Sequence, residues 1–141
     1  MERLRNKIFS VEEANRLLPA LEHSLVVLTG IAREATTVRR EIEVLGAIAG
    51  SGASEESPDV RALREKERLQ AEQLERFRSE LGAVSRHGCI LRDLELGLVD
   101  FYTMAQGRVV CLCWRRGEPR IEHWHPLDEG FSGRRPLSEL L

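Results

Sequence analysis

The sequence is poor in aromatic residues and in cysteine, and it contains no long hydrophobic run. Aromatic residues make up 5% of its 141 residues, and it has three cysteines. An odd and small number of cysteines does not form a disulfide scaffold, so we expect a reducing, cytoplasmic environment. No apolar run approaches the roughly 20 residues of a membrane span, and the charged start of the chain lacks the apolar stretch of a secretory signal.

Neither sign of charge is in large excess. The 21 Lys and Arg residues are balanced by 23 Asp and Glu residues, which gives a formal net charge of −2. Because a nucleic-acid-binding surface needs a strong positive field, we expect no nucleic-acid partner. The sequence also lacks a nucleophile elbow, a phosphate-binding glycine loop and a dinucleotide fingerprint. It therefore names no reaction, and its length fits one domain.

The first half of the chain begins with a marked helix start. Ser10 and Glu13 have the spacing of a capping box, in which each side chain bonds the other residue's backbone amide. Apolar residues then recur every three or four positions over 11–35, which predicts a helix. Pro19 lies inside it, and we expect a kink or break at the preceding residue. The Gly- and Ser-rich stretch 46–57 should end this helix at its first residue and form a flexible connection.

A second helix start follows directly. Ser57 is placed as the cap and Pro58 at the first helical position. Oppositely charged side chains four residues apart, such as Arg68 and Glu72, support the helix and indicate a solvated face. We expect Gly82 to end it.

The two segments predict a long antiparallel, coiled-coil-like hairpin over residues 10–82. The apolar residues of its first helix cover an arc of about 160°, wider than the stripe of about 100° that one partner helix needs. The same hairpin from another subunit would cover the surplus, so we expect a homodimer that forms through the hairpin. The arc consists of Leu25, Val27, Leu28, Ile31, Ala32, Val38, Ile42 and Leu45.

The second half of the chain, residues 83–141, has a different pattern. Short runs of branched and aromatic residues are separated by Gly97, Gly107 and Gly117, which predicts a small antiparallel β-meander. The segment 126–137 is rich in turn residues, and we expect it to wrap over the sheet without regular structure. The whole chain is thus predicted as a single α+β domain. The runs are Ile90–Leu91, Leu98–Tyr102, Val109–Trp114 and Ile121–His125.

Seven segments, spread over nearly the whole chain, form one pattern. They are Phe9–Asn15, Leu17–Pro19, Gly97–Phe101, Cys113–Pro119, Trp124–His125, Leu127–Phe131 and Gly133–Arg134. With these segments the sequence resembles a prokaryotic family of uncharacterised proteins, "domain of unknown function 2203". The resemblance implies a small, soluble bacterial or archaeal protein and implies no activity. Pro126 departs from the pattern, because a polar residue is expected there.

Two cysteines and two histidines at alternating positions form a candidate metal site: Cys111, Cys113, His123 and His125. Thiolate and imidazole are good ligands for zinc and related ions. Ligands two residues apart on a strand are separated by roughly 6.5–7 Å, which is wide for a structural zinc site. The alternative is two small buried cysteines that pack on the first helix beside a partly exposed His123.

The register of the last hairpin decides whether these four side chains share a face. A five-residue loop would pair Trp114 with Arg120, so that Cys113 faces Ile121 and Cys111 faces His123, with all four candidates on one side. A four-residue loop would place cysteines and histidines on opposite sides. A proline at position 119 cannot donate to a ladder, which favours the longer loop.

A second set of candidates surrounds the final loop and would bind a small ligand. A histidine beside a carboxylate can act as a general base, and an arginine can bind an anionic group, which suggests a pocket for a small acid or a phosphorylated ligand. The alternative is structural: acidic and basic side chains that tie the irregular segment to the sheet, and tryptophans that pack in the core. The candidates are Asp100, Trp114, Glu118, Trp124, His125, Asp128 and Arg134.

Two functions follow from the sequence. The favoured one is a non-enzymatic interaction or scaffolding module that dimerises through its hairpin. The competing one is a small-ligand or metal-binding protein, or an enzyme of that kind, with a site around His125. Zinc or a similar divalent ion is the one cofactor that the residues suggest, and we expect no membrane partner.

Overall fold

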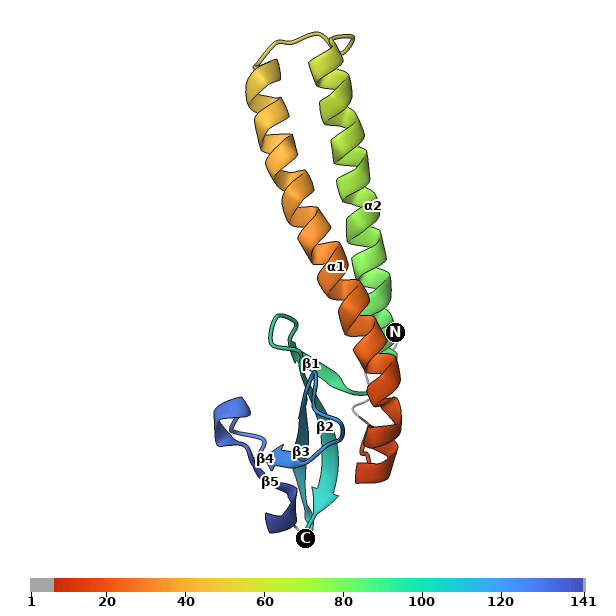
Figure 1. Ribbon diagram of the computed structural model, residues 1–141, viewed down its shortest axis with the longest axis vertical. Helices are drawn as coiled ribbons and strands as arrows, with labels where there is room; N and C mark the ends of the chain where they lie inside the picture. The colour runs from red at the N-terminus through yellow and green to blue at the C-terminus, as the bar shows by residue number, and fades with distance from the viewer. Residues whose placement is uncertain (1–6, 141) are drawn as a thin grey trace. The chain divides into compact units, whose positions relative to one another are not determined.

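The computed structural model describes residues 7–140, which form an α+β structure of two long helices and a five-stranded antiparallel sheet (Figure 1). The predicted fold class is confirmed. The chain divides into two compact units, one formed by Val27–Glu80 and one formed by the two ends of the chain up to Val26 and from Leu81. Within residues 7–140, no helix combines the length and the hydrophobicity needed to cross a bilayer.

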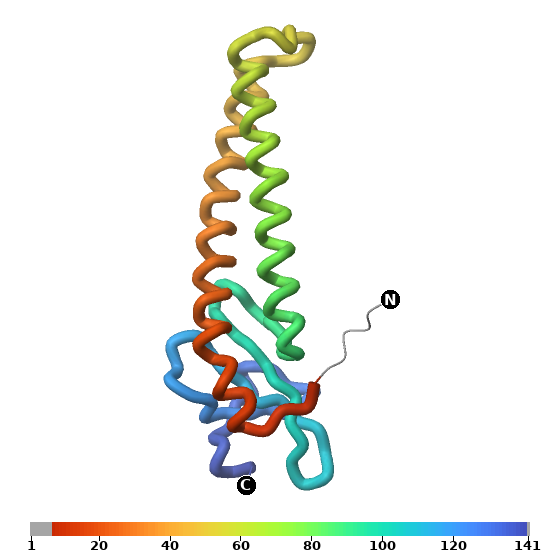
Figure 2. Tube along the Cα trace, turned by 90° about the vertical axis from the view of Figure 1, so that its right-hand side faces the viewer, coloured from red at the N-terminus to blue at the C-terminus, as the bar shows by residue number. Residues whose placement is uncertain are grey.

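The unit Val27–Glu80 is an antiparallel helical hairpin (Figure 2). It contains most of α1 (Val11–Ala49) and of α2 (Pro58–Arg86). The connection between them is 50–57, shorter than the predicted 46–57 because α1 continues to Ala49. The predicted hairpin is therefore confirmed.

Packing inside the hairpin follows the predicted apolar face of α1. Val38 on α1 and Val60 on α2 are buried. The ammonium group of Lys66 bridges the two helices by an ion pair of 2.9 Å with Glu41. Charged pairs along α2 include Arg68 and Glu72, four residues apart and 2.5 Å between their nearest atoms. Such exposed pairs add little stability each, so burial holds the hairpin together.

The start of α1 has the predicted capping box. The backbone amide of Ser10 donates to Glu13 Oε1 at 3.0 Å, and the Glu13 amide donates to Ser10 Oγ at 3.1 Å. Of the kink or break expected at Pro19, the break is wrong, because α1 is continuous through this residue. A proline inside a helix costs about 3 kcal/mol. Leu18 and Leu21 on either side are buried, and burying each leucine contributes about 1.5–3 kcal/mol, which offsets that cost.

Both helices also continue past the glycine that was expected to end them. Gly46 lies within α1 and Gly82 within α2. A glycine in a helix costs only about 1 kcal/mol relative to alanine. The helices end instead just before Gly50 and Gly88, whose φ angles of 69° and 89° lie in the left-handed region that terminates helices.

The sheet is a meander in which each strand pairs with the next, in the order β1-β2-β3-β4-β5. This confirms the predicted antiparallel sheet. The expectation that segment 126–137 has no regular structure is wrong, since it contributes β5 and a short 3-10 helix at Phe131–Gly133. The strands are β1 (Ile90–Asp93), β2 (Leu98–Ala105), β3 (Arg108–Arg115), β4 (His123–His125) and β5 (Arg135–Pro136).

The pairing of β3 with β4 differs from the predicted register by two residues. Cys111 pairs with His125 and Cys113 with His123, so Trp114 does not pair with Arg120. Ile121 lies outside β4. Its side chain is buried, and its backbone amide donates to the side chain of Asn15 at 2.8 Å. A slip of two residues keeps every side chain on the same face, so the predicted sharing of one face survives the wrong register.

The two faces of the sheet carry different residues. On one face lies Phe101, whose ring meets Phe9 edge to face with centroids 5.3 Å apart. Because side chains alternate along a strand, the neighbouring Asp100 points to the other face. Cys113 pairs with Asp100 and with His123, so all three share one face. Cys111 and His125 pair with each other, two positions away on the same strands, and therefore also lie on this face, opposite Phe101.

Candidate functional site

Three side chains of metal-ligand type converge on one face of the sheet. Asp100 comes from β2, Cys113 from β3 and His125 from β4. One ligand atom from each lies within 4.8 Å of the other two, and each residue is at most 2% exposed. Three neighbouring strands thus supply a carboxylate, a thiol and an imidazole to one buried point.

The orientation of His125 is fixed by the backbone of the next residue. Its Nδ1 atom lies 2.8 Å from the carbonyl oxygen of Pro126. A carbonyl only accepts, so Nδ1 carries the proton and donates it. The Nε2 atom therefore points into the cluster, 3.0 Å from Oδ2 of Asp100.

Asp100 has a second partner at the same carboxylate oxygen. Arg92 Nε donates to Oδ2 at 2.9 Å, and this hydrogen bond, against the opposing effect of burial, raises the pKa of the guanidinium. A buried carboxylate without a cation is costly, and Arg92 supplies the compensating charge. The β-bulge between Leu91 and Asp93 accompanies the placement of Arg92 beside the site.

Cys113 is a neutral thiol in this environment. Burial, with the nearby Asp100 charge as a smaller contribution, raises the pKa of Cys113 to about 12. Burial likewise raises the pKa of Cys111 to about 11. A thiolate at position 113 therefore requires a cation in place of the thiol proton.

A cavity of about 280 Å³ adjoins the three groups. Asp100, Cys113 and His125 form part of its lining, and Arg92 belongs to it as well. The opposite wall comes from the segment 127–131, which follows β4. The segment that was expected to wrap over the sheet thus encloses a space above the cluster.

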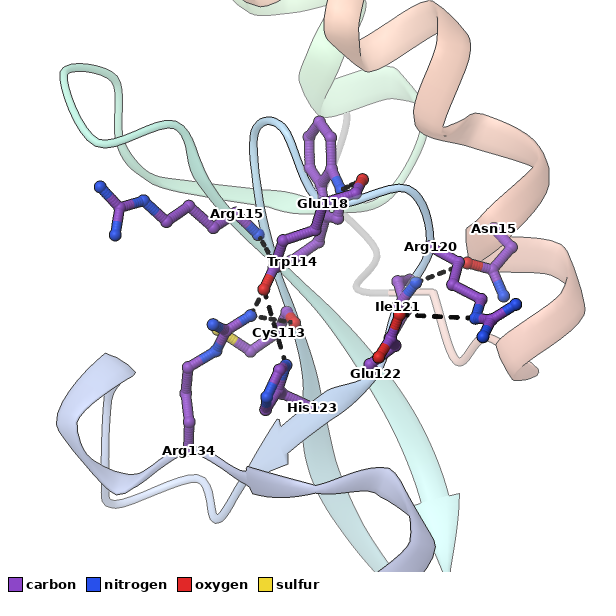
Figure 3. Close-up of polar contacts among 10 residues, drawn as sticks. All are labelled: Asn15, Cys113, Trp114, Arg115, Glu118, Arg120, Ile121, Glu122, His123 and Arg134. Atoms are coloured by element: carbon purple, nitrogen blue, oxygen red, sulfur yellow. Dashed lines mark hydrogen bonds and ion pairs between the residues drawn. The ribbon is translucent and has the colours of Figure 1, made fainter.

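A group of polar contacts beside this cavity joins Arg134 to Glu118 and to β3 (Figure 3). Arg134 Nη2 donates to Glu118 Oε1 at 2.6 Å and to the backbone oxygen of Cys113 at 3.1 Å. The Arg134 guanidinium also lies over the Phe131 ring at 4.8 Å, with Arg115 over the same ring at 5.8 Å. These contacts hold Phe131 in place at the cavity.

Glu118 is the acceptor at the centre of this group. Burial alone would raise its pKa, but the hydrogen bond from Arg134 and the backbone amide of Arg115 outweigh burial and lower it. His123 lies 3.6 Å from Glu118 through its Nδ1 atom and is therefore part of this group (Figure 3). Glu118 and Arg134 thus tie the C-terminal segment to β3, as the structural alternative proposed.

The structure separates the remaining candidates into different places. Asp128 lines the cavity, whereas Cys111 and His123 are outside the three-residue cluster. Trp114 and Trp124 are buried on the face of Phe101, and Trp114 Nε1 donates to the carbonyl of Glu118 at 2.9 Å.

Sequence reasoning missed two features of this site. Arg92 was not considered, and Asp100 was considered as a ligand-binding residue but not as a metal ligand. The signal for Asp100 was available, because a β2–β3 hairpin closed near Gly107 places residue 100 opposite residue 113. The bulge at Arg92 had no signal in the sequence.

The chain belongs to the family of uncharacterised conserved proteins designated DUF2203, whose family model matches residues 7–137. This confirms the resemblance seen in the sequence. Comparisons with curated proteins and with solved structures each gave no match. The family assigns no activity, so a function for this site has to rest on its geometry.

Proposed function

We propose that this protein binds one divalent metal ion of the zinc class through Asp100, Cys113 and His125. The observation that carries the proposal is the convergence of a carboxylate, a thiol and an imidazole nitrogen within 4.8 Å, all buried. Zinc binds sulfur at about 2.3 Å and nitrogen or oxygen at about 2.0–2.2 Å, so its ligand atoms lie roughly 3.3–3.8 Å apart. Small side-chain movements, which widen the 3.0 Å separation of His125 Nε2 and Asp100 Oδ2, bring these atoms to that spacing.

The surroundings of the three groups support a metal rather than a simple hydrogen-bonded cluster. Metal-binding histidines almost always donate their second ring nitrogen to a carbonyl or carboxylate, as His125 does to Pro126. Arg92 holds Asp100 in the way that outer partners hold ligating carboxylates. A dication would balance the charge of a Cys113 thiolate, while Arg92 balances the charge of Asp100.

The test is the metal content of the purified full-length protein, before and after reconstitution with Zn²⁺ or Co²⁺. We expect one ion per chain, and for Co²⁺ an absorption band from sulfur-to-metal charge transfer. Cys113→Ser should abolish that band and weaken binding at least tenfold. Cys111→Ser is the matched control, two positions away on the same strand, and should retain both.

The opposite outcome is equally clear. Substoichiometric, non-saturable binding by the wild-type protein, or a charge-transfer band that survives Cys113→Ser and disappears in Cys111→Ser, would overturn the proposal. Circular dichroism of each variant separates loss of a ligand from loss of the fold.

A second function, dimerisation through the hairpin as a coiled-coil-like module, is supported by a different observation. Val44 and Ile48, one turn apart on α1, are 57% and 60% exposed, and Leu74 on α2 is 50% exposed. Aliphatic side chains that remain this open on a hairpin suit an interface with a second copy.

Sedimentation at micromolar concentration tests this module. The wild-type protein should be a dimer, and Ile48→Glu should make it a monomer. Ala47→Glu places the same charge on the neighbouring exposed position and should leave the dimer intact. A wild-type monomer would refute the module without affecting the metal site.

We also propose a cytoplasmic location in a prokaryotic cell. All three cysteines are free and buried, which suits a reducing compartment. Fractionation of cells that express the protein tests the location, and recovery outside the cytoplasm would contradict it.

A further inference from the structure

We infer that the metal site is open and that its free coordination position takes the carboxylate group of a small ligand with a short apolar chain. The inference rests on the proposed metal site. Two parts of the structure carry it: the number of protein ligands, and the composition of the adjoining cavity.

The protein supplies three ligands, which leaves one position of a tetrahedral ion free. Structural zinc sites are closed by four protein ligands, whereas sites that act on other molecules keep three and an open position. Within the described part of the chain, the cluster has three members. The same three residues line the cavity of about 280 Å³, so the open position has room for a ligand beside the ion.

The charges around the cavity favour an anion at that position. Arg92 lines the cavity and adds a second cation next to the ion. An arginine binds a carboxylate through planar, paired hydrogen bonds, so one carboxylate oxygen could bind the metal and the other Arg92. Of the two acidic residues on the opposite wall, Glu129 is paired with Arg135 at 3.1 Å, and Asp128 is exposed and screened by water.

The rest of the lining favours a short apolar chain on the ligand. Leu98, Leu127 and Phe131 are part of the cavity wall. The volume lies at the small end of the range for ligand pockets, about 300–1,000 Å³. Phe131 is held by Arg134 and therefore offers a fixed apolar surface.

The test is a titration of the Co²⁺-loaded protein followed by the visible absorption of the ion. The ligands are acetate, butyrate and butylamine. Butylamine is the control, because it has four carbon atoms like butyrate but is a cation at neutral pH. Butyrate should shift the cobalt bands and bind roughly fifteenfold more tightly than acetate, at about fourfold for each of its two additional methylenes. Butylamine should leave the bands unchanged.

Two variants locate the ligand. Arg92→Gln keeps a donor for Asp100 but loses the charge, and it should weaken butyrate binding at least tenfold. Arg108→Gln, at an exposed position on β3, is its control and should bind as the wild type does. Leu127→Asn changes an exposed apolar wall residue without touching the ion, and it should reduce the affinity for butyrate to that for acetate.

Each result has one meaning. Stoichiometric cobalt whose bands respond to neither carboxylate overturns this inference and leaves the proposed metal site standing. Bands that respond to butylamine but not to butyrate also overturn it. If Leu127→Asn binds butyrate as tightly as the wild type does, the inferred position of the ligand is wrong. This test stands by itself, because it does not need the Arg92→Gln variant to bind cobalt. A protein that binds no cobalt refutes the metal site itself.

Discussion

The Nε2 atom of His125 lies 3.0 Å from Oδ2 of Asp100, and both side chains are shielded from water. The other nitrogen of His125 is already committed to the carbonyl of Pro126. The imidazole can therefore offer only Nε2 to a partner in the site. The same nitrogen faces Asp100 Oδ2, so the two atoms are placed to bind one ion together in the proposed site.

The link between the C-terminal segment and β3 depends on Arg134. Arg134→Ala should lower the free energy of unfolding by about 2 kcal/mol, because it removes the arginine partner of Glu118 and a hydrogen bond to the Cys113 carbonyl. Urea denaturation measures the loss. Arg120→Ala removes an exposed pair with Glu122 and should cost less than about 1 kcal/mol. Equal losses in the two variants would contradict the structural role of Arg134.

The turn between β1 and β2 depends on the absence of a side chain at Gly97. Its φ is 70°, and a Cβ there would lie 2.5 Å from Cβ of Arg116. Gly97→Ala should therefore cost about 2–3 kcal/mol, since it combines backbone strain with a clash. Gly107→Ala has a similar φ of 76° but open space around it, and should cost about 1 kcal/mol. Thermal unfolding of both variants separates the clash from the strain.

Stability at alkaline pH depends on Cys89, which lies outside the proposed metal site. Burial raises the pKa of Cys89 from 9.0 to about 11. Between these values the unfolded thiol ionises while the folded one stays neutral, so stability falls as pH rises, by up to about 1.4 kcal/mol per pH unit. Below pH 9 this contribution is fully present.

Urea denaturation at several pH values from 8 to 11 checks the prediction for Cys89. Cys89→Ala should lose less stability over this range than the wild type, whatever its stability at neutral pH. Parallel curves for the two proteins would contradict the assignment.

The elements of the fold that depend on neighbouring residues could be predicted from the sequence. The capping box at Ser10, the helix start at Pro58 and the meander all have short-range signals, and the structure has each of them. The helix ends were misplaced because glycines inside helices resemble glycines that end them. Only the burial of residues such as Val84, near the end of α2, shows that the helix gains by continuing.

The site was less predictable because it depends on contacts between distant residues. The register of β4 leaves Ile121 outside the sheet, where its amide donates to Asn15, 106 positions away. With that register, the histidine that lies beside Asp100 is His125 and not His123. The sequence pointed to a metal site of cysteines and histidines on one face, and the structure groups one of each with a carboxylate instead.

The most direct test of the metal site is X-ray absorption at the zinc edge of the reconstituted full-length protein. The account predicts one sulfur ligand at about 2.3 Å and two or three nitrogen or oxygen ligands at about 2.0–2.2 Å, with the sulfur signal lost in Cys113→Ser. A zinc ion surrounded only by nitrogen and oxygen, or by two sulfur atoms, would contradict the site formed by Asp100, Cys113 and His125.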